Sequence, residues 1–474
     1  MDRALWRLAV VTTAGTFMAL LDTSIVNVAL HRLELTFGAS VAQLQWVVTA
    51  YILTMATVIP LSGWAARRFG PRQVYVTSLA VFTAGSALCG AAWSVESLVA
   101  FRVVQALGGA MLVPVGMMIM AHAAGPERLA RAMSVTSVPV MLAPVLGPVI
   151  GGFLLDGLGW RWIFLVNVPL GIAALTLALR RLPRGERLAT EPLDVRGALL
   201  LAFGLPAMTY ALAEIGEGAS ILSPAIVFLT VLGPLLIILF VVHALRRERP
   251  LVDVRVFRNA TFRSSALCGI ALTGTVFGSL ILLPLYFQQV RGLDALMTGV
   301  LLMPQGLATA FAPTLTARFV DRFGGGRVVF VGILISVAGT VPLAFIGAQT
   351  PFAVLVAVLA VRGFGNGMAM VPVFASAMRT LRPDQITDAS TQLQLVVRVG
   401  GSLGTTIFAV LLGRALTGAQ GAAAQAEAFA ATFSWVAGAT LFALVPATVL
   451  VRVEARRRRS IAAPHVDPPR AEIA

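Results

Sequence analysis

The stretch LAVVTTAGTFMALLDTSIVNVAL, from Leu8 to Leu30, is mainly apolar and contains a single ionisable side chain, Asp22. A bilayer core about 30 Å thick is crossed by about 20 helical residues, so this stretch is long enough to span a membrane. An ionised aspartate near the centre of a membrane helix costs roughly 2.5 to 3.5 kcal/mol, and such carboxylates usually belong to ion or substrate pathways. Asp22 is therefore the first candidate functional residue.

The composition places the whole chain in the membrane. Of its 474 residues 58% are hydrophobic and only 12% are charged, which lies outside the range of soluble globular proteins. The sequence predicts an all-α integral membrane protein with fourteen transmembrane helices. These spans are expected to begin near residues 8, 44, 74, 97, 134, 161, 197, 221, 264, 296, 327, 351, 390 and 430.

The net charge of +15 comes from arginines that are distributed over the loops between spans. They do not gather on one soluble segment, which argues against nucleic acid as a partner. With the N-terminus inside, the outer loops hold only Arg32, Arg161, Arg291 and Arg414. The positive-inside rule then predicts cytoplasmic N- and C-termini. Because the chain contains no lysine, it is typical of a GC-rich bacterial genome, and we expect it in the bacterial cytoplasmic membrane.

Two segments of the sequence are repeated. The motif at Arg68–Arg72 reappears at Arg322–Arg327, and Ala106–Ala110 is echoed by Gly363–Gly367. Parallel repeats of this kind are typical of transporters. We predict a six-helix bundle in residues 1–182, cytoplasmic linkers with two inserted helices in 183–262, a second six-helix bundle in 263–452, and a basic tail in 453–474 that touches anionic lipid.

The fifth expected span contains Gly147-Pro148-Val149-Ile150-Gly151-Gly152. Proline removes a backbone hydrogen bond and glycine permits close approach of a neighbouring helix. The pattern predicts a bent, tightly packed helix, and an ordinary small-residue interface is the alternative.

This segment is followed by Trp160-Arg161-Trp162-Ile163-Phe164-Leu165-Val166-Asn167-Val168-Pro169-Leu170-Gly171. Together with Leu21–Leu30, Gln45–Tyr51 and Pro284–Gly292, it closely resembles the major facilitator superfamily, and more narrowly its fourteen-span branch of drug:proton antiporters. The resemblance covers nearly the whole chain. It implies transport driven by the proton gradient, with no cofactor.

The resemblance also implies residue roles. The family's first-span carboxylate falls on Asp22, and its fourth-span motif Arg-x-x-Gln falls on Arg102 and Gln105, which implies that Arg102 takes part in proton coupling. The antiporter motif of the fifth span, a bending interface, falls on Gly147, Pro148, Gly151 and Gly152.

One family motif is altered. The loop between spans two and three normally carries an acidic residue before its first arginine, but here Arg67 takes that place in a motif that otherwise keeps Gly63, Arg68 and Gly70. The repeat in the second half keeps Asp321 and Arg322. The acidic contact of this loop is therefore expected in the second half.

A mechanism follows from the residues around Asp22. Gly15, Met18, Ala19 and Asp22 share one helix face that is mostly small, so this face is expected to pack inward with Asp22 toward protein or an aqueous cavity. Arg102 is the candidate counter-charge. We expect alternating access, in which Asp22 takes a proton from outside and releases it inside, while substrate binds the deprotonated form.

The substrate site is expected near the membrane midplane between the halves. Its candidate polar groups, each equally compatible with an interhelical hydrogen bond, are Tyr51, Gln105, Gln288, Gln289, Asn366, Gln392 and Gln394. Arg398 lies inside the thirteenth span, where it either pairs structurally or binds substrate. Because Asp22 is the single acid deep in any span, we expect a lipophilic neutral, monocationic or zwitterionic small molecule rather than a dication.

Three alternatives stay open or are disfavoured. A permease that carries a metabolite by uniport or symport needs more polar cavity groups, and a non-transporting sensor could share the fold. A membrane enzyme is disfavoured, because no histidine, cysteine or carboxylate cluster has catalytic or metal-ligand spacing, and Cys89 and Cys268 lie in apolar spans. The protein is expected to act as a monomer.

Overall fold

The computed structural model describes residues 3–183, 192–216, 218–220 and 222–462, and within these ranges the chain is helical and forms no strand. The helices of the first half are α1 (Arg3–Phe37), α2 (Val41–Val58), α3 (Leu61–Phe69), α4 (Pro71–Gly90), α5 (Val95–Gly157), α6 (Arg161–Leu165) and α7 (Asn167–Arg181). Two helices follow, α8 (Val195–Gly216) and α9 (Pro224–Arg246). The second half contains η1 (Val254–Arg258), α10 (Ala260–Leu285), η2 (Tyr286–Val290), α11 (Ala295–Phe323), α12 (Gly325–Thr340), η3 (Val341–Phe345), α13 (Phe352–Arg379), α14 (Pro383–Leu416), α15 (Gly421–Phe442) and α16 (Leu444–Ala462).

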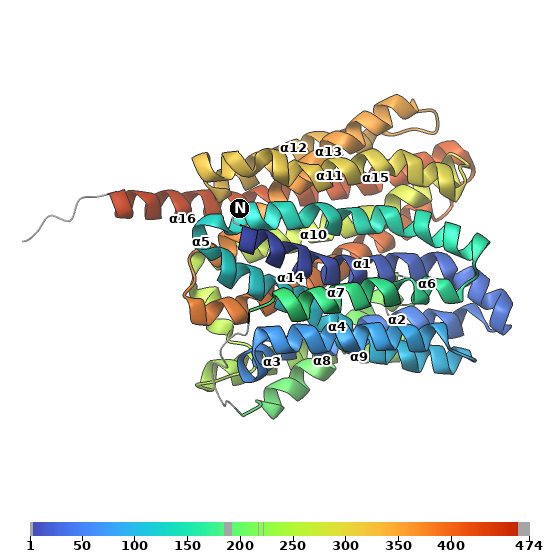
Figure 1. The fold of residues 1–474 in the computed structure, drawn as a ribbon. Helices are drawn as coiled ribbons and strands as arrows, with labels where there is room; N and C mark the ends of the chain where they lie inside the picture. The colour runs from blue at the N-terminus through green and yellow to red at the C-terminus, as the bar shows by residue number, and fades with distance from the viewer. Residues whose placement is uncertain (1–2, 184–191, 217, 221, 463–474) are drawn as a thin grey trace, which may run out of the picture.

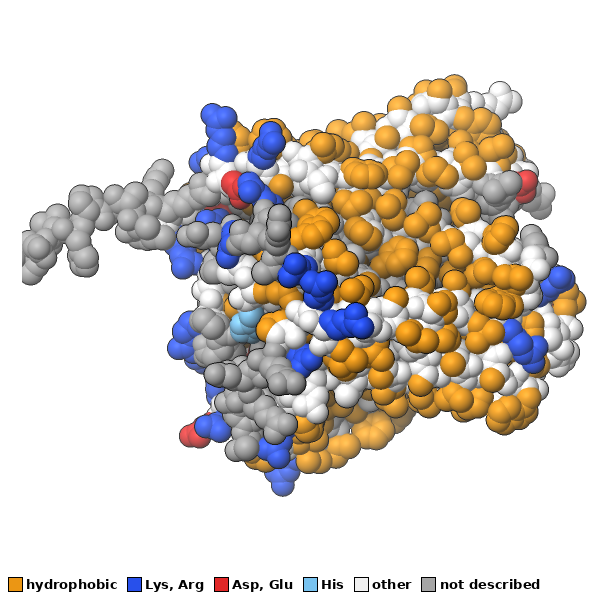
Figure 2. All heavy atoms as spheres, viewed as in Figure 1, with side chains coloured by type: hydrophobic (Ala, Val, Ile, Leu, Met, Phe, Trp, Pro, Cys, Tyr) orange, Lys and Arg blue, Asp and Glu red, His pale blue; other side chains and the backbone are white. Residues whose placement is uncertain are grey.

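The long helices run approximately parallel to one another, and the N-terminus and α16 lie at the same end of the molecule, here named the α16 end (Figure 1). On the visible surface a broad band of apolar side chains lies between two polar ends (Figure 2). Arginines gather at the α16 end, with fewer at the other end (Figure 2). An apolar band of this kind is what a lipid-facing surface requires, because lipid tails offer polar groups no hydrogen-bond partner.

Twelve helices in the described part of the chain are long and apolar enough to cross a membrane. The pair of segments Gln43–Val58 and Leu61–Phe69, bent by 57° at their junction, adds a thirteenth candidate. Helix α9 is the most apolar of them, with a mean hydropathy of 3.0, and only 17% of its window is buried inside the protein. We infer that α9 faces lipid over most of its circumference.

The element α5, 63 residues long, consists of two helices that correspond to two of the expected spans and are separated by a kink at Gly125. The backbone departs from helical geometry at Gly125, where φ is 68°. Glycine tolerates this left-handed conformation because it has no Cβ, so the chain can change direction there without a loop. The part of α5 after Gly125 includes side chains outside the described set and is not among the thirteen candidates, so the count of fourteen spans stays a prediction.

The repeat seen in the sequence has the same backbone conformation in both halves. Gly70 ends α3 with φ 88° and ψ 140°, and Gly324 ends α11 with φ 96° and ψ 154°. This region is strongly unfavourable for residues with a Cβ. The two glycines therefore form equivalent turns, one between α3 and α4 and the other between α11 and α12.

Helices α5 and α13, which contain the second repeated motif, make equivalent contacts in the two halves. Gly108 of α5 lies directly against the backbone of α4 at Phe82, and Gly365 of α13 lies directly against the backbone of α12 at Ser336. A Cβ at either glycine would overlap that backbone. These contacts support the internal repeat with Gly108 aligned to Gly365.

Helix α8 contacts both halves. The Thr57 hydroxyl of α2 donates to the Ala202 carbonyl at 3.4 Å, and the Thr406 hydroxyl of α14 donates to the Leu212 carbonyl at 2.5 Å. Helix α8 of the inserted pair is thus packed against α2 of the first half and α14 of the second half.

Asp194, just before α8, joins the two inserted helices. Its carboxylate is 2.9 Å from His243 Nε2 of α9, and it accepts hydrogen bonds from the amides of Gly197 and Leu251, both at 3.2 Å. Burial acts to raise the pKa of Asp194, but the hydrogen bonds from His243, Gly197 and Leu251 outweigh burial, so this pKa lies below its ordinary value.

Candidate functional site

Asp22 has no exposed surface and accepts hydrogen bonds from three side chains. Its Oδ2 is 2.6 Å from Arg102 Nη1, and its Oδ1 accepts from Gln105 Nε2 and from Asn167 Nδ2, both at 2.8 Å. The donors come from α5 and α7, so the carboxylate of α1 is held by two other helices. Both oxygens of this buried carboxylate are therefore hydrogen-bonded, one of them to a guanidinium.

Ser86 of α4 completes this group, which we name the Asp22 network (Asp22, Ser86, Arg102, Gln105 and Asn167). Its hydroxyl accepts from Gln105 Nε2 at 3.0 Å and from Asn167 Nδ2 at 3.1 Å, and donates to the Phe164 carbonyl at 2.9 Å. Ser86, Gln105 and Asn167 are all buried. The network therefore joins four helices of the first half through side chains shielded from solvent.

Arg102 connects this network to α2. Its guanidinium Nε donates to the Val47 carbonyl at 3.2 Å, and its Cζ lies 4.0 Å from the centroid of the Tyr51 ring. Only 1% of Arg102 is exposed. A guanidinium over an aromatic face is held by a cation–π interaction, so a movement of Arg102 is transmitted to Tyr51.

The chemistry available here is reversible protonation of one carboxylate. Asp22 cannot exchange a proton with water in this conformation, because it is completely buried. Protonation would remove its negative charge and leave the buried Arg102 without a counter-charge, which is costly in a medium of low dielectric constant. In this conformation Asp22 and Arg102 therefore compensate each other's charge.

The chain matches the Major Facilitator Superfamily over residues 12–405. It belongs to this superfamily. The superfamily places it among membrane transporters rather than enzymes. It is similar to the multidrug resistance protein B homolog of Mycobacterium tuberculosis strain H37Rv, with 40% identity over 415 residues, 87% of this chain and 77% of the relative.

Two solved structures share the fold. The human organic anion transporter MFSD10 superposes with a TM-score of 0.68 at 17% identity, covering 95% of this chain and 100% of that one. The proton:xylose symporter XylE superposes with a TM-score of 0.61 at 14% identity, covering 91% and 94%.

The residues predicted to bind substrate do not lie together in the structure. Gln105 belongs to the Asp22 network, and Tyr51 packs against Arg102 of that network. Asn366 Oδ1 accepts from Ser336 Oγ at 2.7 Å, and Gln392 Nε2 donates to the Asp253 carbonyl at 2.7 Å. The Asn366 contact is an interhelical hydrogen bond, whereas the Gln392 contact joins α14 to the segment before η1, and a role of either residue in substrate binding stays a prediction.

Gln288 and Gln289 lie exposed in the π-helical segment η2, at the end of α10. The structure does not bring them to Asp22, and their role in substrate binding stays a prediction.

The fifth-span motif of the transporter is helical from Gly147 to Gly152 within α5. A Cβ on Gly147 would overlap Ser24 of α1, whereas a Cβ on Gly152 would meet open space. Gly151 is buried, and the side chain of Pro148 lies outside the described residues. Close packing in this motif is therefore concentrated at Gly147.

The altered loop motif forms an ion pair between the halves. Arg67 Nη1 of α3 is 2.6 Å from Asp388 Oδ1 of α14, with side-chain exposures of 14% and 13%. Nearby, the hydroxyls of Ser62 and Thr391 are hydrogen-bonded at 3.0 Å, and Gly63 packs against Thr391 and Asp388. Where the family motif has its acid in the first half, this transporter has the base there and the acid on α14.

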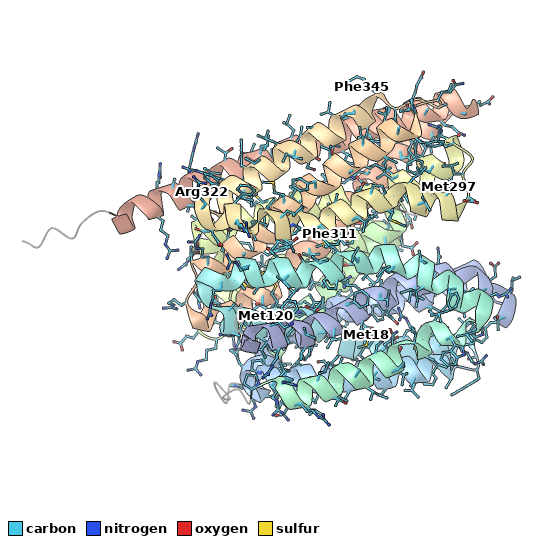
Figure 3. The ribbon with its side chains drawn as sticks, turned by 45° about the horizontal axis from the view of Figure 1, so that its top comes forward. Met18, Met120, Met297, Phe311, Arg322 and Phe345 are labelled. Atoms are coloured by element: carbon cyan, nitrogen blue, oxygen red, sulfur yellow. The ribbon has the colours of Figure 1, made fainter. Side chains whose placement is uncertain are left out.

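The repeat of this loop carries a second pair between the halves. Asp321 Oδ2 of α11 is 3.0 Å from Arg131 Nη2 of α5, with exposures of 42% and 53%. Figure 3 shows Arg322 at the α16 end and Met297 at the opposite end of α11. Arg68 and Arg322 are exposed, and Arg322 lies 5.2 Å from the Phe323 ring centroid. The acidic contact expected in the second half is thus present at Asp321.

The second half has a buried arginine where the first half has Gln105. Gly85 of α4 packs against the backbone of Gln105, and its counterpart Gly339 of α12 packs against the backbone of Arg362. Only 1% of Arg362 is exposed. Its guanidinium donates to four oxygens, Thr340 Oγ1 (3.2 Å), Gln305 Oε1 (3.3 Å), Thr275 O (3.1 Å) and Ser279 Oγ (2.5 Å).

Ser86, Asn167 and Arg362 are functional candidates that were not predicted from the sequence. Asn167 lies in the quoted segment from Trp160 to Gly171, and Arg362 directly precedes the repeat at Gly363–Gly367. A polar side chain inside a repeated or motif-bearing span was therefore the available signal for two of the three residues.

Proposed function

We propose that this transporter exports lipophilic small molecules, such as drugs, antibiotics or a natural product, from a bacterium in exchange for protons. The observation that carries the proposal is the burial of Asp22 with Arg102, Gln105 and Asn167 around it. Among the described residues no other acid inside a candidate span is buried. The multidrug resistance name of the mycobacterial relative supports the substrate class.

Coupling follows from the charges of the Asp22 network. While Asp22 is ionised, it neutralises Arg102 and the first half stays closed around the pair. Protonation from the outside would release Arg102, displace the Tyr51 ring stacked against it, and so alter the contact between α2 and the second half. Release of the proton inside would restore the pair, so substrate and proton would occupy alternate conformers.

The ion pairs Arg67–Asp388 and Arg131–Asp321 would hold the α16 end closed during the outward-facing part of the cycle. We place this end in the cytoplasm because arginines gather there (Figure 2). In this arrangement both termini are cytoplasmic, two six-helix bundles rock against each other around a central site, and the inserted helices bring the spans to fourteen. One chain is sufficient for the cycle.

The test is proton-driven export in proteoliposomes. Asp22→Asn keeps the size and polarity of the side chain but cannot exchange a proton, so it should abolish substrate accumulation driven by a pH gradient. Glu427→Gln, which neutralises an exposed carboxylate on α15, is the matched control and should transport normally. Full proton-driven transport by Asp22→Asn would refute the proposal.

A further inference from the structure

Arg398 is a charged residue near the middle of α14 whose hydrogen-bonding capacity is largely unused. It is partly buried, and its single hydrogen bond to the described residues runs from Nη2 to the thioether sulfur of Met55 on α2, at 3.2 Å. A guanidinium has five N–H donors, and a thioether is a weak acceptor. Inside a membrane such a group requires a stronger partner.

Tyr51 lies one turn before Met55 on α2, in the same buried cluster, and its hydroxyl has no hydrogen-bond partner among the described residues. Tyr51 is 1% exposed, and its hydroxyl makes no hydrogen bond of acceptable geometry. The Thr23 side chain, whose hydroxyl donates to the Ala19 carbonyl at 3.1 Å, is a polar neighbour on α1. Arg398 is close enough to the Tyr51 phenol for an electrostatic interaction. Two groups with unused donors, one on each half, thus lie near each other.

The charges inside the membrane-spanning region also favour an acidic ligand. Asp22 neutralises Arg102, and the donors of Arg362 are taken by four oxygens. No carboxylate of the described residues pairs with Arg362 or Arg398. The interior therefore carries excess positive charge, and Arg398 is the cation there with donors available to a ligand.

We propose that Arg398 and the Tyr51 hydroxyl bind an acidic group of the substrate, so that the preferred cargo is a lipophilic acid or zwitterion. The inference deepens the proposed export function and rests on it. The guanidinium fork can hold a carboxylate, sulfonate or phosphate through two parallel bonds, and the phenol donates a third. The Tyr51 ring also packs against Arg102, the counter-charge of Asp22. A ligand bound to the Tyr51 hydroxyl would therefore contact the residue that we propose moves when Asp22 is protonated.

The test measures binding of a matched pair of dyes to the purified full-length protein by fluorescence anisotropy. The pair is a zwitterionic carboxyl-rhodamine and its methyl ester, which differ in one acidic group. The natural protein should bind the acid at least about tenfold more tightly than the ester, as expected for a charge-assisted bidentate contact. Arg398→Gln should remove this preference and leave the affinity for the ester within about twofold.

Three further variants sharpen the result. Tyr51→Phe should reduce the preference for the acid about threefold, through loss of one donor. Arg398→Lys keeps the positive charge but loses the two parallel N–H donors of the guanidinium, and should give an intermediate ratio of acid to ester affinity. Arg414→Gln removes an exposed arginine from the same helix and should leave the ratio unchanged.

The ratio of the two affinities does not depend on the fraction of correctly folded protein, and if Arg398→Gln does not fold, the ratio of Arg398→Lys decides. Equal binding of acid and ester by the natural protein would overturn the inference, as would an equal loss of both in the Arg398 variant. Either result leaves proton-driven export of the ester in proteoliposomes as a separate test of the proposed function, since binding is measured without transport.

Discussion

Replacing Arg67 by glutamine is expected to open the α16 end of the transporter. The Arg67–Asp388 pair joins α3 to α14 at 2.6 Å, and both side chains are more than four-fifths buried. A hydrogen bond to a charged group contributes about 1.5 to 3 kcal/mol, and the substitution removes the guanidinium beside Asp388. The conformer open at this end should therefore become roughly 10- to 150-fold more populated relative to the closed one.

The assay is labelling of Ser62→Cys in inside-out membrane vesicles, where a membrane-impermeant maleimide reaches the cytoplasmic face. Ser62 has no exposed surface and its hydroxyl contacts Thr391 of the other half, so a cysteine there reacts only when the halves separate. The two natural cysteines, Cys89 and Cys268, are both buried and should give little background. Because labelling is limited by the open population, its rate should rise by the same factor as that population.

Two comparisons make this prediction specific. Arg68→Gln removes the same charge from an exposed neighbour on the same helix and should leave the labelling rate within about twofold of the parent. The exchanged pair Arg67→Asp with Asp388→Arg should return the rate to within about threefold of the parent, as a double-mutant cycle requires. Equal labelling of the Arg67 and Arg68 variants, or no recovery in the exchanged pair, would refute the reasoning.

Further predictions concern stability. Asn167→Ala removes one of three donors to the buried Asp22 and should lower the free energy of unfolding by about 1 to 3 kcal/mol, and an unchanged thermal midpoint would contradict this. Gly147→Ala, whose Cβ overlaps Ser24, should cost about 1 to 3 kcal/mol in the same assay, whereas Gly152→Ala, which meets open space, should be neutral or stabilising. The folded pKa of Asp194 lies below its ordinary value, so its contribution to stability is present at neutral pH and is lost as the pH falls below about 4. Asp194→Asn should therefore flatten the acid side of the stability profile, and a profile with the same slope as the parent would show that the carboxylate has no such role.

Much of the architecture could be predicted because membrane insertion depends on local sequence. Apolar length and arginine placement predict the spans and their ends, since each helix must satisfy its own backbone in lipid. The equivalent turns at Gly70 and Gly324 could be predicted from a repeated motif, because a positive φ favours glycine wherever it occurs. The kink at Gly125 separates the spans expected to begin near residues 97 and 134, but a single glycine does not reveal whether the chain forms a loop or a kink there.

The candidate site shows the same division. The hydropathy of the first span alone identifies Asp22 as an unusual charged residue in an apolar helix. The resemblance of the fourth span to the family motif adds Arg102. The sequence cannot state that the carboxylate also accepts from Asn167, which lies 145 residues away, or that Arg67 pairs with Asp388 across 321 residues. Those partners depend on which helix faces pack together. The unused donors of Arg398, 343 residues from its contact at Met55, likewise become visible only when α14 is placed beside α2. Transfer of each segment into lipid is a local property and can be predicted from the sequence, whereas the pairing of buried charges is a property of the assembled helices and required the tertiary structure.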